Sequence, residues 1–426
     1  MRLALAAVLG ALLLAGCGGN DTTAASAAAA GLAPADAKAY VELDTSLDSD
    51  QWKQAQALLD RFPKRPQLVE KLNEQLRDHQ LEWERDVDPA LGDQLVLLWL
   101  GKTPADAVVL TQADDQAKFQ ALVRKVADGK PVVVGNVEGW SAAAERQSAI
   151  DALAASGGSL ADDDAFSTAL AKLPAERLGF GWARGDALPA DAPKLKFAWF
   201  AGALEARDDG TAATIVTSVS EGSAGAAYES KLVDLAPADA LAFLSFDGSS
   251  LRANTAALGD LPGVLGGPVK ELLAQVRGEG ALWVRPGLGM PQVTLVAEVE
   301  DPGAAGTALR ELLAQVPLGV KVGVVDGKLV ATSASSPEAA LQAGGDHLGG
   351  SADFQEAAKV AGMPDKTTGF LFVNVADALP LLSLAGLAGA DVPKELIENL
   401  RPVRSVVAWG EPEGSTSTNT IFVHVE

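Results

Sequence analysis

The chain has 426 residues, of which 48% are hydrophobic and 21% charged, a composition typical of globular protein with room for two domains. Its 34 Lys and Arg residues against 56 Asp and Glu residues give a formal net charge of −22. This charge argues against a nucleic-acid partner, because phosphate backbones need a basic surface. The single cysteine excludes a disulfide framework and any CxxC metal or redox site.

The first residues predict export. Arg2 precedes an uninterrupted apolar run of twelve residues, Leu3–Leu14. The run is shorter than the roughly 20 residues that span a bilayer, but it fits the hydrophobic region of a signal peptide. It ends at Leu14, Ala15, Gly16 and Cys17, which resemble the lipobox of bacterial lipoproteins. The alternatives are an ordinary cleaved signal and an uncleaved anchor helix, with an incidental cysteine in either case.

The lipobox resemblance implies a signal peptide at residues 1–16, cleavage before Cys17, a diacylglycerol on its sulfur and an acyl group on its amine. Two or more acyl chains anchor stably, because each buried methylene contributes ~0.8 kcal/mol. The lipidated cysteine and a flexible tether of small residues would occupy residues 17–31. We therefore expect an exported protein that lipid holds to a bacterial membrane, with the type of envelope and the leaflet left open. No other cofactor is expected.

An internal repeat organises the rest of the chain. Leu32–Asp44 recurs as Leu235–Asp247 with 8 identities in 13 residues, and Val132–Phe166 aligns without gaps on Val320–Phe354 with 13 identities in 35. Further matches follow in the same order, namely Gly179-Phe180 with Gly369-Phe370 and Ala198-Trp199 with Ala408-Trp409. The repeat predicts two tandem copies at 32–222 and 235–426, joined by a linker at 223–234. Whether the copies pack as one body is left open.

Each copy is predicted to contain the same elements in the same order. A strand (39–44; 242–247) and a helical region precede two strands (95–100 and 107–111; 281–285 and 292–299). A helix opened by an acidic cap follows, at Asp114 and Asp115 or at Asp301, and then a hairpin whose turn is Glu138-Gly139 or Asp326-Gly327. Two further helices and three strands close each copy. We expect an α+β fold, in which each copy is a mainly antiparallel β-sheet with helices packed on one face.

Some of these turns resemble a known family. The Ala-Pro-Ala-Asp opening, the turn Asp88–Asp93 and the Asp-Gly hairpin followed by Ser336–Glu338 are similar to the uncharacterised bacterial envelope family called domain of unknown function 3352. The resemblance covers nearly all of 32–426, but the second copy has Arg277–Gly280 where the first has the Asp-Pro turn. It implies a fold and an envelope location, and no activity.

The sequence offers no catalytic or metal site. It has no Gly-x-Ser-x-Gly motif, and its histidines (His79, His347 and His424) are scattered. The best metal-like cluster is His79 with Glu82, Glu84, Asp86 and Asp88, and we favour a solvated helix end and an Asp-Pro turn over a metal site there. Asp162, Asp163 and Asp164 are better explained as an N-cap and first-turn acids than as calcium ligands.

Two apolar, glycine-rich segments are the remaining candidates for function: 255–268 and 378–390, the second with Leu381, Leu382, Leu384 and Leu387. They are either buried packing or an apolar flap beside a cleft that takes an acyl chain. We therefore predict a non-enzymatic binding or structural component of the cell envelope. A carrier of lipid or another hydrophobic ligand is the alternative, and an extracytoplasmic hydrolase is less favoured. The expected partners are the membrane and either a hydrophobic ligand or an envelope protein, with the oligomeric state open.

Overall fold

A computed structural model describes residues 28–153, 157–187, 197–219, 225–248, 275–287, 290–313, 319–341, 345–387 and 393–426. The predicted lipobox and the apolar segment 255–268 lie outside the described residues. By their internal contacts the described residues divide into two units, the first reaching Ser218 and the second running from Val219 to Glu426. No helix among the described residues is long and apolar enough to cross a membrane.

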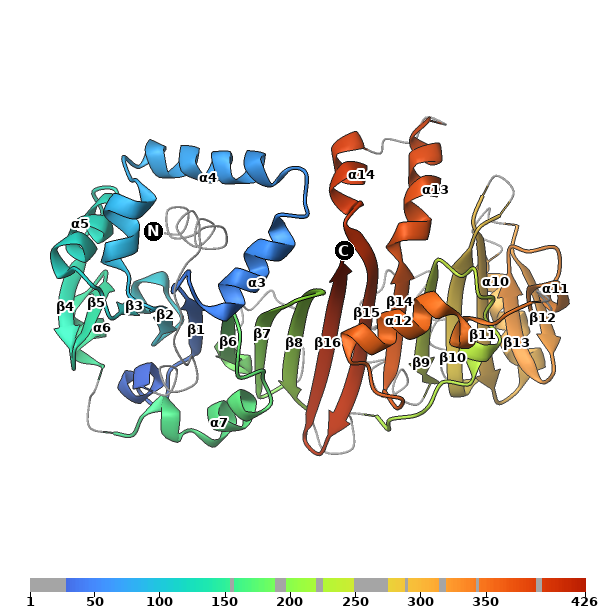
Figure 1. The fold of residues 1–426 in the computed structure, drawn as a ribbon. Helices are drawn as coiled ribbons and strands as arrows, with labels where there is room; N and C mark the ends of the chain where they lie inside the picture. Colours follow the sequence, from blue (N-terminus) through green and yellow to red (C-terminus); the bar gives the residue numbers. More distant parts are fainter. Residues whose placement is uncertain are drawn as a thin grey trace. The chain divides into compact units, whose positions relative to one another are not determined.

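The first unit is built on an antiparallel sheet (Figure 1). Its strand order is β4-β5-β3-β2-β1-β6-β7-β8, so the first strand of the chain lies in the middle of the sheet. The strands are β1 (Ala39–Asp44), β2 (Gln94–Trp99), β3 (Ala107–Thr111), β4 (Val133–Val137), β5 (Trp140–Ala144), β6 (Gly179–Arg184), β7 (Trp199–Arg207) and β8 (Gly210–Ser218). The helices are α3 (Asp50–Leu59), α4 (Arg65–Asp78), α5 (Gln116–Ala127), α6 (Gln147–Asp151) and α7 (Asp164–Ala171).

The second unit has a sheet with the corresponding order, β12-β13-β11-β10-β9-β14-β15-β16. Its strands are β9 (Ala242–Asp247), β10 (Val276–Arg285), β11 (Gln292–Val299), β12 (Lys321–Val325), β13 (Lys328–Thr332), β14 (Gly369–Asn374), β15 (Val403–Glu413) and β16 (Thr416–Val425). Its helices are α10 (Pro302–Leu313), α11 (Pro337–Leu341), α12 (Ala352–Ala361), α13 (Val375–Leu387) and α14 (Lys394–Leu400). The predicted α+β class with antiparallel strands is confirmed.

Local chemistry explains several of these elements. The Asp115 carboxylate accepts hydrogen bonds from the first backbone amides of α5, and Asp301 does the same for the amides of Gly303 and Ala304. Both hairpin turns place two successive residues at positive φ, with Asp326 at 51° and Gly327 at 74° in the second unit. This is the type I′ geometry that an Asp-Gly pair favours.

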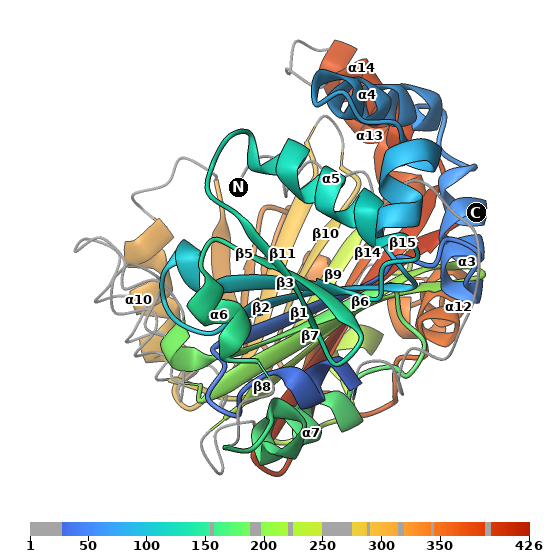
Figure 2. The same ribbon diagram turned by 90° about the vertical axis from the view of Figure 1, so that its left-hand side faces the viewer.

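Helices cover both faces of the first sheet, so the predicted single covered face is wrong. Along β3, Val108 and Leu110 belong to the core beneath α6 and α7, whereas Val109 packs against the core that Phe119 of α5 completes. Figure 2 shows α5 and α7 on opposite sides of the strands. Alternate strand residues point to opposite faces, so a strand that is apolar at both needs cover on both.

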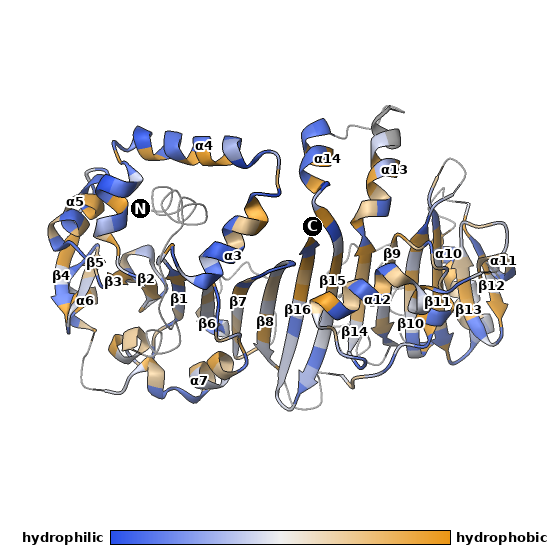
Figure 3. Ribbon diagram, in the orientation of Figure 1, coloured by the Kyte–Doolittle hydropathy of each residue, from blue (hydrophilic) through white to orange (hydrophobic). Residues whose placement is uncertain are grey.

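The second sheet is also covered on both faces. Leu329 and Ala331 of β13 pack against Ala305 and Leu309 of α10. On the opposite face, the ring of Phe354 in α12 lies 5.6 Å from that of Phe370 in β14. By contrast, α4 buries only Leu76 and is mostly hydrophilic along its length (Figure 3).

Three sequence expectations need correction. Residues 28–32 are helical, and Ala29 and Ala30 are fully buried in the first core, because alanine both favours helix and packs closely. The expected tether therefore does not extend to residue 31. Likewise, in the expected linker Leu232 is 1% exposed, and the turn Leu232–Asp234 contacts β9 and β10 of the second unit.

The match between Trp199 and Trp409 is also not a structural equivalence. Trp199 pairs with Arg184 at the end of β6, whereas Trp409 pairs with Phe370 near the start of β14. By register, the residue that corresponds to Trp409 is Ala203, which pairs with Phe180.

Candidate binding site

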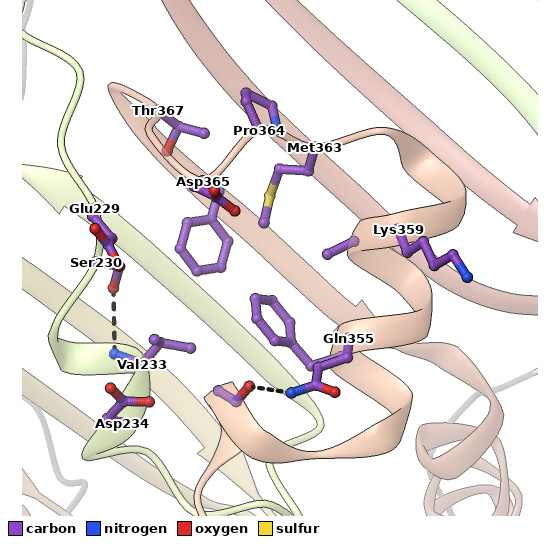
Figure 4. A pocket seen from close by; sticks show the side chains of 14 residues that line it. Glu229, Ser230, Val233, Asp234, Gln355, Lys359, Met363, Pro364, Asp365 and Thr367 are labelled. Atoms are coloured by element: carbon purple, nitrogen blue, oxygen red, sulfur yellow. Dashed lines mark hydrogen bonds between the residues drawn. The ribbon is translucent and has the colours of Figure 1, made fainter.

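A cavity of about 420 Å³ lies in the second unit, between the segment that precedes β9 and helix α12 with the loop that follows it (Figure 4). Two aromatic residues, Phe354 and Phe370, are among those that line it. Its lining residues are Glu229, Ser230, Val233, Asp234, Gly349, Phe354, Gln355, Ala358, Lys359, Met363, Pro364, Asp365, Thr367 and Phe370. The volume is in the range of sites that hold small molecules.

The wall on the α12 side is fixed by the two ends of that helix. Ser351 caps its N-terminus by accepting a hydrogen bond from the amide of Phe354 at 3.3 Å. At the C-terminus, Gly362 adopts a left-handed conformation with φ of 77°, which glycine accommodates without strain. This turn leads into Met363, Pro364 and Asp365, which reach back along the cavity.

The opposite wall is held by a buried carboxylate. Glu279 of β10 accepts hydrogen bonds from the Ser230 hydroxyl at 2.5 Å and from the amide of Lys231 at 2.8 Å. It also accepts one from the Ser245 hydroxyl at 2.8 Å. Charged hydrogen bonds of this kind are stronger than neutral ones, so the wall is held in one position.

Tyr228 extends this network. Its hydroxyl lies 2.7 Å from the Ser245 hydroxyl, whose hydrogen is already donated to Glu279, so Tyr228 is the donor. Burial raises the pKa of Tyr228 above its usual range, and the nearby Glu279 and Asp247 carboxylates add to the rise. Tyr228 and Thr367 also exchange two backbone hydrogen bonds, of 2.9 and 3.0 Å, which join the two walls.

The first unit fills the corresponding place with a side chain. Arg177 is 1% exposed, and its guanidinium carbon lies 4.5 Å from the centroid of the Phe180 ring. Burial lowers the pKa of Arg177, while the Glu42 carboxylate opposes that change. Glu42 is itself buried and accepts a hydrogen bond of 2.7 Å from the Tyr40 hydroxyl. Tyr40, Glu42, Arg177 and Phe180 therefore form one buried cluster of side chains.

A second polar group lies at the end of β1. Burial raises the pKa of Asp44 to about 6, against hydrogen bonds from Ser49 and Ser46 that lower it. Its Oδ2 atom and the side-chain amide of the neighbouring Gln94 are buried with no hydrogen-bond partner among the described residues. Such groups reduce stability, because water no longer solvates them.

The cluster around His79 is a helix end followed by a turn. Helix α4 ends at Asp78, and Gln80 has φ of 56°, so His79 and Glu82 do not share a helix face. Glu82 instead pairs with Arg85 at 2.9 Å. Among the described residues, no group of three or more His, Cys, Asp or Glu side chains has a geometry that holds a metal ion.

Asp163 and Asp164 have the roles that were predicted for them, whereas Asp162 acts in the preceding 3₁₀ helix, Leu160–Asp162. Asp163 caps α7 by accepting from the amide of Phe166 at 2.9 Å, Asp164 lies in the first turn, and Asp162 closes a capping box with Ser159. His424 is buried in β16, and the backbone of His347 pairs with that of Pro237. These two histidines do not line the cavity.

The segment 378–390 does not line the cavity where the structure describes it. Helix α13 contains Pro380, packs against β15 and exposes Leu382 at 39%, while Leu381 is half-buried. The side chains of Leu384 and Leu387 and the predicted lipidation site, Cys17, lie outside the described residues. The sequence signal for the real cavity was the repeated Gly-Phe pair, preceded by Arg177 in one copy and Thr367 in the other.

Comparisons with known proteins add little. No family model matches the chain, and no curated protein matches it. A solved structure titled "Structure of crystal form IV of TP0453" matches 45% of this chain and 93% of its own, at 10% identity and a TM-score of 0.26. A likeness this weak supports no conclusion about fold or function.

Proposed function

We propose that this chain is a lipid-anchored, extracytoplasmic bacterial protein with a non-enzymatic binding role, and that its ligand occupies the cavity of the second unit. The observation that carries the binding role is the cavity itself, whose two walls are fixed by backbone pairing and a buried carboxylate. A site that is already formed loses little entropy when a ligand enters. The lipobox at Leu14–Cys17 supports the anchor and the location.

We also propose that the two units are copies of one ancestral domain, of the envelope family that the turns resemble. Their identical strand order and the aligned Gly179-Phe180 and Gly369-Phe370 pairs support this origin. On this proposal, the copies have diverged in role. The first fills the position beside Phe180 with Arg177, and the second keeps it open beside Phe370.

A carrier of an apolar ligand is the second candidate. Val233, Ala358, Met363, Pro364 and the two phenylalanines supply apolar contacts in the cavity. However, carboxylates line the same space, and they disfavour a purely aliphatic occupant. A hydrolase is less favoured, because no histidine or cysteine is among the residues that line the cavity.

The proposed membrane anchor is tested on the N-terminus of the native protein. We expect the N-terminal peptide of the membrane-extracted protein to carry acyl groups on Cys17, and Cys17→Ser to release the protein from the membrane fraction. An uncleaved or unmodified N-terminus would contradict the proposed membrane anchor.

The binding role is tested by native mass spectrometry of the gently extracted protein. We expect an added mass that survives on the folded body and is lost on unfolding. Ala358→Trp, which fills the cavity from α12, should abolish it. Glu356→Trp is the matched control, since Glu356 is exposed on the same helix and does not line the cavity. If the wild-type protein carries no added mass, or if both variants retain the added mass equally, the support for this site is removed.

A further inference from the structure

We propose that the ligand of this cavity is a cation, a guanidinium or an ammonium group on a short apolar body. This inference rests on the proposed binding function and names the chemical class of the ligand. Two independent observations carry it, one from the comparison of the two units and one from the charges of the cavity.

The first observation is a position that the two sheets share. Phe180 is the second residue of β6 and pairs with Glu42 in β1, while Phe370 is the second residue of β14 and pairs with Ser245 in β9. Each ring contacts one ring from the covering helix and one from the central strand. The centroid distances are 6.0 Å to Phe166 and 5.3 Å to Tyr40 in the first unit, and 5.6 Å to Phe354 and 5.3 Å to Phe243 in the second.

In the first unit a guanidinium occupies the face of that ring. Arg177, three residues before Phe180, lies 4.5 Å above its centroid. Three residues before Phe370 the chain has Thr367, whose side chain is too short to reach over the ring. Phe370, which is 5% exposed, is among the residues that line the cavity. The face of an aromatic ring attracts cations, and the first unit shows this geometry with the protein's own arginine.

The second observation is the charge of the lining. Glu229, Asp234 and Asp365 contribute three carboxylates to the cavity, against the single ammonium of Lys359. In Figure 4 the Lys359 side chain extends away from Asp365, whereas Glu229 and Asp365 approach the same end of the cavity from opposite walls. Buried Glu279 adds a further negative charge directly behind Ser230. An anionic headgroup or a fatty acid would be repelled by these groups.

The size of the cavity sets the rest of the ligand. A space of about 420 Å³ exceeds what a bare guanidinium fills, so the cation must carry a body that contacts Val233, Ala358 and Met363. A ligand of this kind places its charge between the carboxylates and the ring of Phe370. Its apolar part then excludes water from the rest of the space.

The test compares two probes of nearly the same shape and different charge. Butylguanidinium chloride and neutral butylurea are titrated into the whole protein by isothermal calorimetry at pH 7.5 and low salt. We expect butylguanidinium to bind at least tenfold more tightly and to weaken as salt is added. We expect Asp365→Asn to weaken butylguanidinium several-fold and to leave butylurea unchanged. Glu356→Gln, outside the cavity on α12, should change neither affinity.

Thr367→Arg supplies the guanidinium from within the chain and should abolish binding of both probes. Asp365→Asn keeps the inference testable if this variant does not fold. The inference is overturned if butylurea binds as tightly as butylguanidinium, or if Asp365→Asn has no effect, while Ala358→Trp still blocks a native ligand. That result would still support a binding function for the cavity, but it would exclude a cation as the ligand. If no probe binds and no native ligand is retained, both the inference and the proposed function fail.

Discussion

Replacing Asp44 with asparagine should stabilise the protein at neutral and alkaline pH and have little effect in acid. The carboxyl is 4% exposed, and Glu42 and Asp93 lie near enough to oppose its ionisation. Its Oδ1 atom accepts a hydrogen bond of 2.8 Å from the amide of Ser46, which asparagine retains. Its Oδ2 atom has no hydrogen-bond partner among the described residues, so the substitution breaks no bond there.

The sign of the pH dependence follows from the direction in which the pKa of Asp44 is shifted. Because burial raises the pKa of Asp44 from 3.8 to about 6 in the folded protein, the folded state holds the proton over a range in which the unfolded chain has lost it. Stability therefore falls as the pH rises from about 4 to about 6, and the loss persists above that window. A shift of about two units corresponds to about 3 kcal/mol. Because nearby solvent screens the charge, we expect a gain of about 1–2 kcal/mol for Asp44→Asn at pH 8.

Urea unfolding, followed by tryptophan fluorescence at pH 4.5 and pH 8, measures this difference. We expect the midpoint of Asp44→Asn to exceed that of the wild type at pH 8 and to approach it at pH 4.5. The matched control is Asp36→Asn, an exposed carboxylate before β1, for which we expect less than about 0.5 kcal/mol at either pH. An equal gain at both pH values, or a loss at pH 8, would refute the reasoning.

Three further predictions concern stability and use the same urea assay. Arg177→Ala removes the buried cation that faces Glu42 and should cost about 3–5 kcal/mol, so a loss below about 1 kcal/mol would contradict the pairing. In the turn of the first hairpin, Glu138 and Gly139 have φ of 50° and 88°. Glu138→Asn should therefore stabilise the protein by up to about 1 kcal/mol, and Gly139→Ala should destabilise it by a similar amount. Effects of the opposite sign would contradict the type I′ assignment. Ser351→Ala should cost about 1 kcal/mol through the lost N-cap of α12, and an unchanged midpoint would show that the cap contributes nothing.

The sequence predicted strands where alternation and turn chemistry coincide. The strands at 39–44, 107–111, 242–247 and 292–299 have the predicted ends, because each is a run of β-forming residues bounded by turns. The faces that the helices cover could not be predicted in this way. Each helix shows one apolar stripe, and the stripe does not say on which side of the sheet the helix packs.

Sequence patterns could not predict the cavity, for a different reason. Its walls come from Glu229–Asp234 and from α12 with the following loop, which are more than a hundred residues apart in the chain. The carboxylate that fixes one wall, Glu279, lies on a third element, β10. The sequence predicted that strand only from residue 281 and compared Arg277–Gly280 with a turn, whereas the strand begins at Val276. The sequence does differ at this site, with Arg177 in one copy and Thr367 in the other, but the difference gains meaning only once the two registers are known.

The central place of the first strand in each sheet has a consequence for the order of folding. Strand β1 needs β6 as a neighbour, and Leu43 pairs with Gly179, while β9 needs β14, and Phe246 pairs with Gly369. Each sheet therefore stays incomplete until more than a hundred further residues have become available. Contacts so distant in sequence slow folding. In a nascent chain with this topology, each unit therefore stays open until its own C-terminal strands have been made, and the first unit can close before the second is complete.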